Sequence, residues 1–327
     1  MKRILFAGIL LLLFSGCSPK AEQPPETTLP PETTLPLATE ATELFIGEEA
    51  AALAEAPVPA VPVILETDAP GLLEQRCETA VVDYSNTEDG YIMVQYTAET
   101  EKRLKVRIQG PTTTYTYNLP PQAWTVFPLS DGDGNYRATV YRNTGGNEYA
   151  TVMSVRFPVT LGDEFAPFLR PNQYVNYADS PESMAMGAAL CTGLTHPLEK
   201  VAAVYDYVVD NLSYDYDKAS TVKSGYLPVL DAVLEAKKGI CFDYAALMTA
   251  MLRSQQVPCK LVVGYAGSTY HAWISVWTEE NGWVDGAIFF DGVSWKRMDP
   301  TFASSGERSE EIMDFIENGN YRVKYLY

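Results

Sequence analysis

The segment Gly239-Ile-Cys-Phe-Asp-Tyr-Ala245 decides how the C-terminal half of this chain is interpreted. The glycine permits a tight turn, and the apolar pattern that follows predicts a helix from about Cys241 to Arg253. Cys241 then lies in the first helical turn, where free N–H groups and the helix dipole favour thiolate over thiol. A thiolate is a nucleophile at neutral pH, so Cys241 is a candidate catalytic residue.

Two further motifs carry the side chains that such a nucleophile requires. His271-Ala-Trp273 opens a predicted strand, and its imidazole could act as base and later protonate a leaving group. Met298-Asp-Pro-Thr301 places Asp299 at a predicted strand end, where a carboxylate can fix the tautomer and orientation of the ring. Cys241, His271 and Asp299 therefore form a candidate Cys-His-Asp triad.

The motifs GICFDYA, HAW and DPT together resemble the core of the transglutaminase-like superfamily, a relative of papain-like cysteine proteases. The resemblance implies an α+β domain of the transglutaminase/papain-like type, with Cys241 as nucleophile, His271 as base and Asp299 as orienting residue. It also implies acyl chemistry on peptide or protein amides through a thioester on Cys241, with no cofactor.

The orienting carboxylate departs from the family pattern in one respect. The separation of His271 and Asp299 is longer than is usual in the family, and Trp283-Val-Asp285 is a rival match within it. We favour Asp299 over Asp285 because Pro300 and Thr301 follow it.

The oxyanion hole is less well defined by the sequence. The backbone N–H of Cys241 is one natural donor, and the family adds a side chain from upstream. Tyr214, Tyr216 and Tyr226 are candidates for this second donor, and the sequence does not rank them.

The N-terminal residues predict export and anchoring. Lys2 and Arg3 precede a short apolar stretch, so residues 1–16 are expected to be a signal peptide. Ser15 and Gly16 lead into Cys17, which resembles the lipobox of bacterial lipoproteins and implies lipidation of Cys17 and attachment to the cell membrane. Residues 17–62 are rich in Pro, Thr and Glu and repeat PETTLP, which predicts a disordered tether.

Charge and cysteine content exclude several classes of protein. The formal net charge is −18, and losing Lys2 and Arg3 with the signal peptide would take it to −20. This excess of acid argues against nucleic acid as a partner. Of five cysteines, three remain if Cys17 is lipidated and Cys241 is catalytic, so Cys77, Cys191 and Cys259 cannot all pair. No CxxC motif or histidine cluster indicates a metal site.

Residues 63–177 are expected to form an antiparallel β-sandwich resembling an immunoglobulin-like module. Leu104, Val106 and Ile108 alternate with polar residues, and similar strands are predicted at Tyr91–Tyr96, Tyr115–Leu119, Tyr136–Tyr141 and Ala150–Phe157. The pattern contains no catalytic motif. A purely structural role is expected, and binding of a cell-wall or protein ligand is the alternative.

Residues 178–327 are expected to form the transglutaminase-like domain. Ser180 and Pro181 predict a helix start, and a second helix beginning near Pro197 buries one stripe, with His196 as an exposed end residue. Strands are expected at Leu261–Tyr265 and His271–Trp277, and a closing helix near Ser309–Glu317. Trp273, Trp277, Trp283 and Trp295 are candidates to line a groove, although burial in the core is the commoner use of tryptophan.

Two classes of function remain open at this stage. The first is an extracytoplasmic, membrane-anchored cysteine acyltransferase or hydrolase that acts on a protein or peptide substrate. The second is a non-catalytic surface adhesin or wall-binding protein that uses the transglutaminase-like domain as a scaffold.

Overall fold

The computed structural model describes residues 58–280, 282–285, 288–290, 295–297 and 321–327. These residues belong to one compact unit that extends from Glu55 to Tyr327. The expected signal peptide, Cys17, most of the tether, Asp299 and the expected helix at Ser309–Glu317 lie outside the described residues. Within the described ranges, no helix is both long and apolar enough to cross a bilayer.

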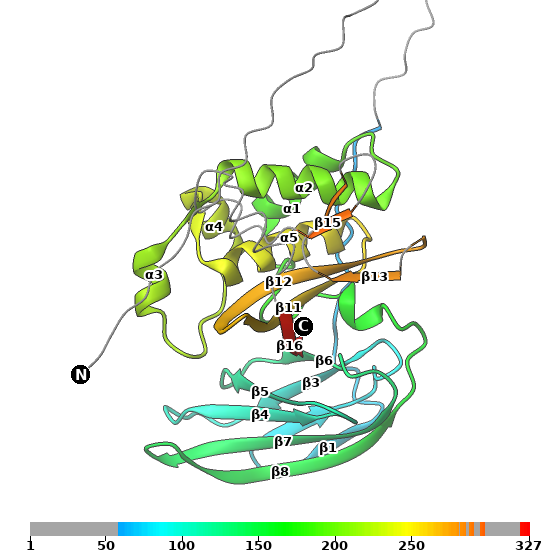
Figure 1. Ribbon diagram of the computed structural model, residues 1–327. Coiled ribbons are helices and arrows are strands. Elements are labelled where there is room, and N and C mark those ends of the chain that lie inside the picture. The colour runs from blue at the N-terminus through cyan, green and yellow to red at the C-terminus, as the bar shows by residue number, and fades with distance from the viewer. Residues whose placement is uncertain (1–57, 281, 286–287, 291–294, 298–320) are drawn as a thin grey trace, which may run out of the picture. The chain divides into compact units, whose positions relative to one another are not determined.

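The first half of the unit consists of two antiparallel four-stranded sheets (Figure 1). One sheet has the order β1-β2-β3-β6, with β1 Glu74–Arg76, β2 Ala80–Asp83, β3 Tyr91–Tyr96 and β6 Thr125–Pro128. The other has the order β5-β4-β7-β8, with β4 Leu104–Gln109, β5 Thr114–Leu119, β7 Gly134–Gly145 and β8 Glu148–Val159. All five strands predicted from alternation are confirmed. The pattern of β4 shows why, because Leu104, Val106 and Ile108 are buried while Arg107 and Gln109 are exposed.

The second half begins after a 3-10 turn, η1 Ala166–Phe168, and places helices against a further antiparallel sheet (Figure 1). The helices are α1 Pro181–Cys191, α2 Pro197–Asn211, α3 Tyr216–Thr221, α4 Leu230–Ala236 and α5 Cys241–Ser254. The sheet has the order β13-β12-β11-β16, with β11 Cys259–Ala266, β12 Thr269–Thr278, β13 Gly282–Asp285 and β16 Tyr321–Leu326. Two small pairs complete the list: β9 Ser213–Tyr214 with β10 Lys238–Gly239, and β14 Ile288–Phe290 with β15 Trp295–Arg297.

The predicted start of α1 is confirmed in position but not in its capping contact. Ser180 is the N-cap residue, yet its hydroxyl donates to the carbonyl of Asn176 instead of accepting from the first turn. The carboxylate of Asp231 on α4 accepts from the backbone N–H groups of Glu182 and Ser183. A tertiary contact therefore satisfies the free N–H groups of the first helical turn, which the sequence predicts to be capped locally by Ser180.

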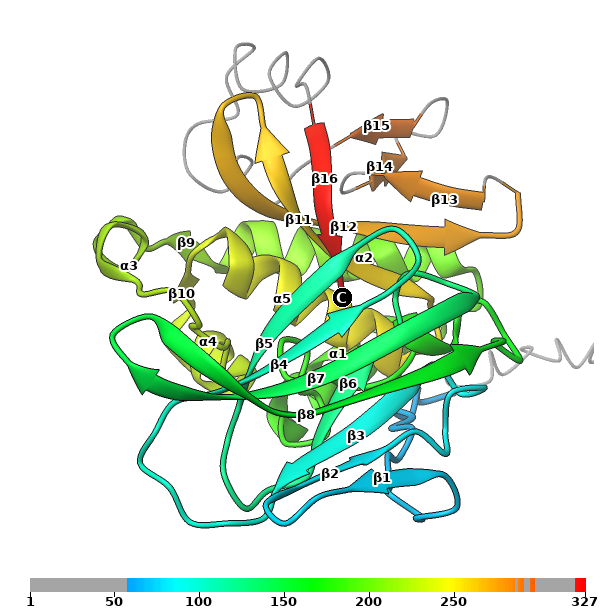
Figure 2. The ribbon, with the colours of Figure 1, turned by 90° about the horizontal axis from the view of Figure 1, so that it is seen from below.

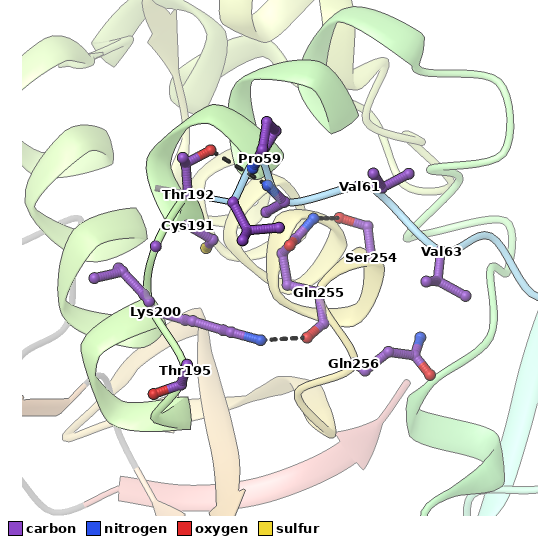
Figure 3. A pocket seen from close by; sticks show the side chains of 14 residues that line it. Pro59, Val61, Val63, Cys191, Thr192, Thr195, Lys200, Ser254, Gln255 and Gln256 are labelled. Atoms are coloured by element: carbon purple, nitrogen blue, oxygen red, sulfur yellow. Dashed lines mark hydrogen bonds between the residues drawn. The ribbon is translucent and has the colours of Figure 1, made fainter. Parts of the chain in front are cut away.

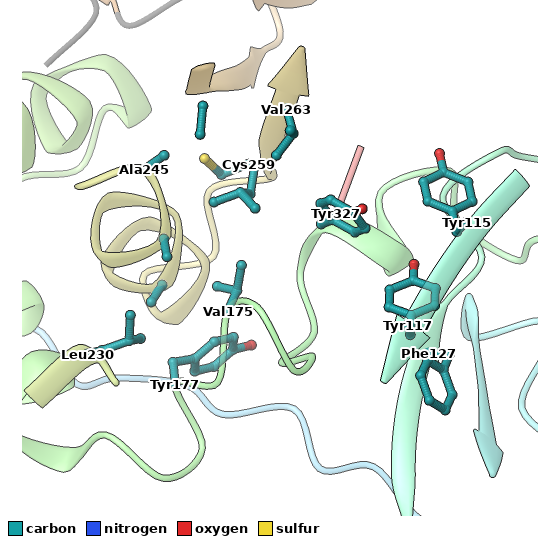
Figure 4. Close-up of a cluster of buried hydrophobic side chains, with 14 of the residues drawn as sticks. Tyr115, Tyr117, Phe127, Val175, Tyr177, Leu230, Ala245, Cys259, Val263 and Tyr327 are labelled. Carbon is teal, nitrogen blue, oxygen red and sulfur yellow. The ribbon is translucent and has the colours of Figure 1, made fainter. Parts of the chain in front are cut away.

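The two halves share one hydrophobic core, and aromatic rings join them (Figure 4). Tyr117 of β5 packs against Phe127 of the facing sheet, with ring centroids 5.0 Å apart, and against Tyr327 at 5.8 Å. Tyr115 contacts Tyr325 at 5.7 Å. Burial of such rings contributes more than burial of any aliphatic residue of this core, so the junction is a stabilising part of the fold.

A fully buried arginine links three segments that are remote in sequence. Arg253 near the end of α5 donates to the carbonyls of Cys259 at 2.9 Å, Arg170 at 2.8 Å and Tyr327 at 2.6 Å. Burial lowers its pKa to about 10, still well above neutrality, so the guanidinium remains charged and its donors are used by backbone oxygens.

We therefore expect Arg253→Met to lower the free energy of unfolding by about 3 kcal/mol, because buried carbonyls would lose their donors. Urea denaturation followed by tryptophan fluorescence measures the change. Arg76→Met is the matched control, since Arg76 is exposed on β1, and it should shift stability by less than about 0.5 kcal/mol. Equal midpoints for the two variants would contradict this role of Arg253.

Candidate functional site

Cys241 is the first residue of α5, as the sequence predicts. The short strand β10 leads into it and pairs in parallel with β9, which fixes the direction of entry. Gly239 is required here by close packing and not by an unusual backbone angle. A Cβ at position 239 would lie 2.8 Å from the Cβ of Asp243. The half-buried Cys241 side chain is thus held at a helix N-terminus.

His271 lies on β12, in the third position of the strand and not at its opening. Its backbone pairs with Gly264 of β11, and its ring stacks near Trp273 with centroids 6.4 Å apart. The imidazole residue is buried, and it lines the same cavity as Cys241, with a volume of about 560 Å³. The structure therefore brings the expected nucleophile and base to one cavity.

Tyrosines, and not tryptophans, line this cavity. The lining includes Tyr174, Tyr214, Tyr226, Tyr270, Tyr325 and Tyr327. Among the described lining residues there is no aspartate or glutamate, and Lys223 is the single lysine or arginine. Trp277 and Trp283 instead pack against Phe165, with ring centroids 4.5 and 6.0 Å away, and Trp273 is buried. The side chain of Trp295 lies outside the described part of the chain.

Asp243 is a site residue that sequence reasoning missed. Its fully buried carboxylate accepts from the backbone N–H of Ile240 at 2.8 Å, from Lys218 Nζ at 2.6 Å and from the Tyr226 hydroxyl at 2.6 Å. An acid at the third position of a helix is a recognisable capping signal, so Asp243 could have been identified as a cap. Its two partners from outside the helix have no local signal.

The three candidate oxyanion tyrosines differ in their surroundings. Tyr214 lines the cavity, whereas Tyr216 does not and is 64% exposed. Tyr226 also lines the cavity, but its hydroxyl is bound to Asp243. Burial, and then the Asp243 carboxylate, raise the pKa of Tyr226, so this hydroxyl stays protonated. Tyr214 and Tyr216 contact each other, with ring centroids 4.9 Å apart.

The two candidate orienting carboxylates, Asp285 and Asp299, lie on either side of the β14–β15 hairpin in the sequence. The backbone register places Asp285 of β13 opposite Ser275, four residues along β12 from His271. At about 3.3 Å per residue, the offset is roughly 13 Å. β14 and β15 then form a hairpin that ends at Arg297, two residues before Asp299. Asp299 itself lies outside the described residues.

The other cysteines and His196 lack the features of a reactive pair. Cys191 and Cys259 are buried, and burial raises the pKa of both thiols, that of Cys259 to about 11. Cys77, Cys191, Cys241 and Cys259 are all free of disulfides. His196 is the N-cap of α2, as expected, but it is half-buried and not fully exposed, and it accepts from the N–H of Leu198.

A second cavity, of about 840 Å³, lies near the C-terminal end of α5, away from Cys241 (Figure 3). The last residues of the expected tether line it, and Ala60 donates its N–H to Thr192. Lys200 donates to the carbonyl of Gln255, and the cysteine of this cavity is the buried Cys191. No histidine lines it among the described residues, so it offers no nucleophile with a base.

Comparison with known proteins identifies the region that contains this site. Residues 185–286 match the model of the transglutaminase-like superfamily. The protein-glutamine gamma-glutamyltransferase of Pseudomonas aeruginosa is 25% identical over 150 residues, which are 41% of this chain and 20% of that protein. The uncharacterized protein YebA of Bacillus subtilis is 27% identical over 134 residues, 35% of this chain and 18% of YebA. The chain thus spans about a fifth of the length of these curated relatives.

Among solved structures, the periplasmic domain of TgpA from Pseudomonas aeruginosa, bound to ethylmercury, is similar with a TM-score of 0.33 and 16% identity. That likeness covers 74% of this chain and 78% of the TgpA chain. The family match itself includes Cys241, His271 and Asp285 and ends before Asp299. Residues 185–286, which contain Cys241, His271 and most of the other residues that line the cavity, are a domain of the transglutaminase-like superfamily.

Proposed function

We propose that this protein is an extracytoplasmic cysteine acyltransferase or hydrolase that acts on peptide or protein amides. The observation that carries the proposal is the placement of Cys241, at a helix N-terminus, and His271, on the neighbouring strand, in one cavity. Cys241 attacks the amide carbon as a thiolate, and the imidazolium of His271 gives its proton to the departing amine. An amine or water then attacks the thioester on Cys241, gives its proton to the imidazole of His271 and takes the acyl group, which restores the thiolate and the imidazolium.

Asp299 serves as the orienting carboxylate in this proposal. The extra residues between His271 and Asp299 are taken up by the β14–β15 hairpin, which accounts for the long spacing in the sequence. The backbone register sets Asp285 roughly 13 Å along the sheet from His271, and this offset disfavours Asp285 as the orienting residue. The family match ends at residue 286, but this boundary gives no physical reason to prefer Asp285 over Asp299.

Location and anchoring are also part of the proposal. The signal sequence and Cys17 support a lipid-anchored, extracytoplasmic protein, and a similar solved structure is named as a periplasmic domain. Residues 17–57 then act as a tether. The two sheets of the first half form an immunoglobulin-like sandwich that supports the cavity, because Thr116 of β5 lines it.

A non-catalytic adhesin is the alternative that this site has to exclude. We expect iodoacetamide to label Cys241 fast and selectively at neutral pH, because the helix N-terminus and His271 favour the thiolate. Labelling should become slow in His271→Ala, as measured by peptide mass spectrometry. Cys77→Ser is the control and should leave the Cys241 rate unchanged. Uniformly slow labelling of all cysteines would favour a scaffold.

Turnover tests the nucleophile directly. Incubation with a dansylated amine and a glutamine-containing protein, followed by mass spectrometry, separates transfer from hydrolysis. Cys241→Ser should keep its fold and form no acyl-enzyme, because a serine hydroxyl is far less acidic than a thiol. Turnover equal to that of the wild type would refute the assignment of Cys241.

The two carboxylates can be separated by paired variants. We expect Asp299→Ala to lower kcat by roughly a hundredfold or more while the melting temperature changes little, since an unoriented imidazole populates unproductive tautomers. Asp285→Ala is the matched control and should retain most activity. Loss of activity in Asp285→Ala alone would show that the orienting residue was misassigned.

Substitution of the three tyrosines by phenylalanine ranks the oxyanion donors. Tyr214 is our choice because it lines the cavity, whereas the hydroxyl of Tyr226 donates to Asp243, so Tyr214→Phe should lower kcat roughly a hundredfold. Tyr216→Phe should have little effect because this side chain is exposed. Tyr226→Phe should lower thermal stability, since Asp243 would lose a donor. An unchanged kcat in Tyr214→Phe would remove it from the oxyanion hole.

A further inference from the structure

The strands β5, β4, β7 and β8 lie side by side in one sheet (Figure 2). The outward face of this sheet carries cations at register positions that face the same side. Arg107 of β4 is paired with Thr116 of β5 and Thr139 of β7, and Gln109 is paired with Arg137. Arg137 is in turn paired with Arg156 of β8. Because side chains alternate along a strand, Lys105, Arg107, Arg137 and Arg156 lie on one face, which we call the basic face.

The basic face is unusual in a chain with a net charge of −18. The other outward positions of these paired segments are threonine, serine, asparagine, glutamine, tyrosine and proline, and the one carboxylate among the paired residues is Glu148, at the start of β8. None of the four cations forms an ion pair with a described residue. Arg137 and Arg156 are opposite each other, an arrangement that weakens a sheet. Folding alone gives no reason for this pair.

The basic face is continuous with the cavity of Cys241. Thr116, which is paired with Arg107, lines that cavity. Lys105 donates to Asn118 at 2.6 Å, and Asn118 donates to the carbonyl of Gly225 in the loop that borders the cavity.

A hollow of about 690 Å³ lies at this end of the sheet. Lys102, Arg103, Lys105 and Ser224 line it, with Glu101 as the single carboxylate among the described lining residues. Ser224 also lines the Cys241 cavity, so the hollow and the cavity share a border.

We propose that the basic face binds an acidic segment of the polypeptide substrate beside the amide that reacts at Cys241. Arginine forks bind carboxylates through paired hydrogen bonds, which suits aspartate and glutamate side chains. A broad anionic surface such as a membrane is disfavoured because the protein as a whole is acidic and would be repelled from it. This inference deepens the proposed function and rests on it for the identity of the substrate.

Direct binding tests the basic face without turnover. Fluorescence anisotropy measures the affinity of a fluorescein-labelled oligoglutamate peptide for the Cys241→Ser protein. The same affinity is measured after Arg107→Glu/Arg137→Glu is added to that protein. We expect about tenfold weaker binding in the charge-reversed protein and weakening by added NaCl. Arg107→Gln/Arg137→Gln removes the charges without reversing them and should give a smaller loss of affinity. This milder variant tests the same charges with less risk of misfolding. Arg76→Glu on β1 is the control with unchanged affinity.

Steady-state kinetics then links the face to the reaction. With Cys241 intact, Arg107→Glu/Arg137→Glu should raise KM about tenfold for a glutamine peptide flanked by glutamates, with kcat and the KM of a neutral peptide unchanged.

Several outcomes would overturn the proposal. These are equal oligoglutamate affinity in all variants, or preferential binding of phosphatidylglycerol vesicles or polyphosphate. The protein could also bind oligoglutamate through the basic face and yet show no turnover. That result would support peptide binding by the basic face and refute the proposed catalytic function.

Discussion

The site depends on one buried carboxylate. Asp243 has no exposed surface, and an ion so placed is stable only with several donors. It receives one from the backbone of Ile240, one from Lys218 of α3 and one from Tyr226. These contacts fix the start of α5, and therefore Cys241, against α3 and the loop with Tyr226, which lines the cavity. Gly239 makes this packing possible because any larger residue would overlap Asp243.

The parts of the fold that the sequence predicts well are those in which apolar residues recur at a regular spacing along the chain. The alternation of Leu104, Val106 and Ile108 and the apolar stripe of α2 depend on neighbours along the chain, and both are confirmed. β16 was not expected, because its pairing with β11 joins residues about sixty positions apart and leaves no local period. The contacts of Asp231 with α1 and of Asp243 with Lys218 and Tyr226 were missed for the same reason. Cys241 and His271 could be placed in one cavity only through the family resemblance, since neither has a local partner.

The two-sheet half contributes to the site as well as to stability. Asn118 of β5 binds the carbonyl of Gly225, whose φ is +88°, and a side chain at this glycine would overlap Asn118. The neighbouring Tyr226 binds Asp243. A displacement of β5 would therefore reach the start of α5 through one loop. This connection gives the first half a positioning role that its lack of catalytic motifs conceals.

The cavity and its surroundings differ in charge, and this difference bears on the choice between an amine and water as acceptor. Burial raises the pKa of Tyr174 to about 12, and also raises those of Tyr226 and Tyr327, so these hydroxyls are neutral at physiological pH. The faces of these rings can pack against the carbon chain of an amine, and they offer water fewer hydrogen-bond partners than carboxylates would. Tyr270 lines the cavity and is 54% exposed, and Lys324 Nζ lies 5.8 Å from its ring centroid. An ammonium ion that approaches past Tyr270 meets this positive charge, so the proposed reaction would favour the deprotonated amine as acceptor.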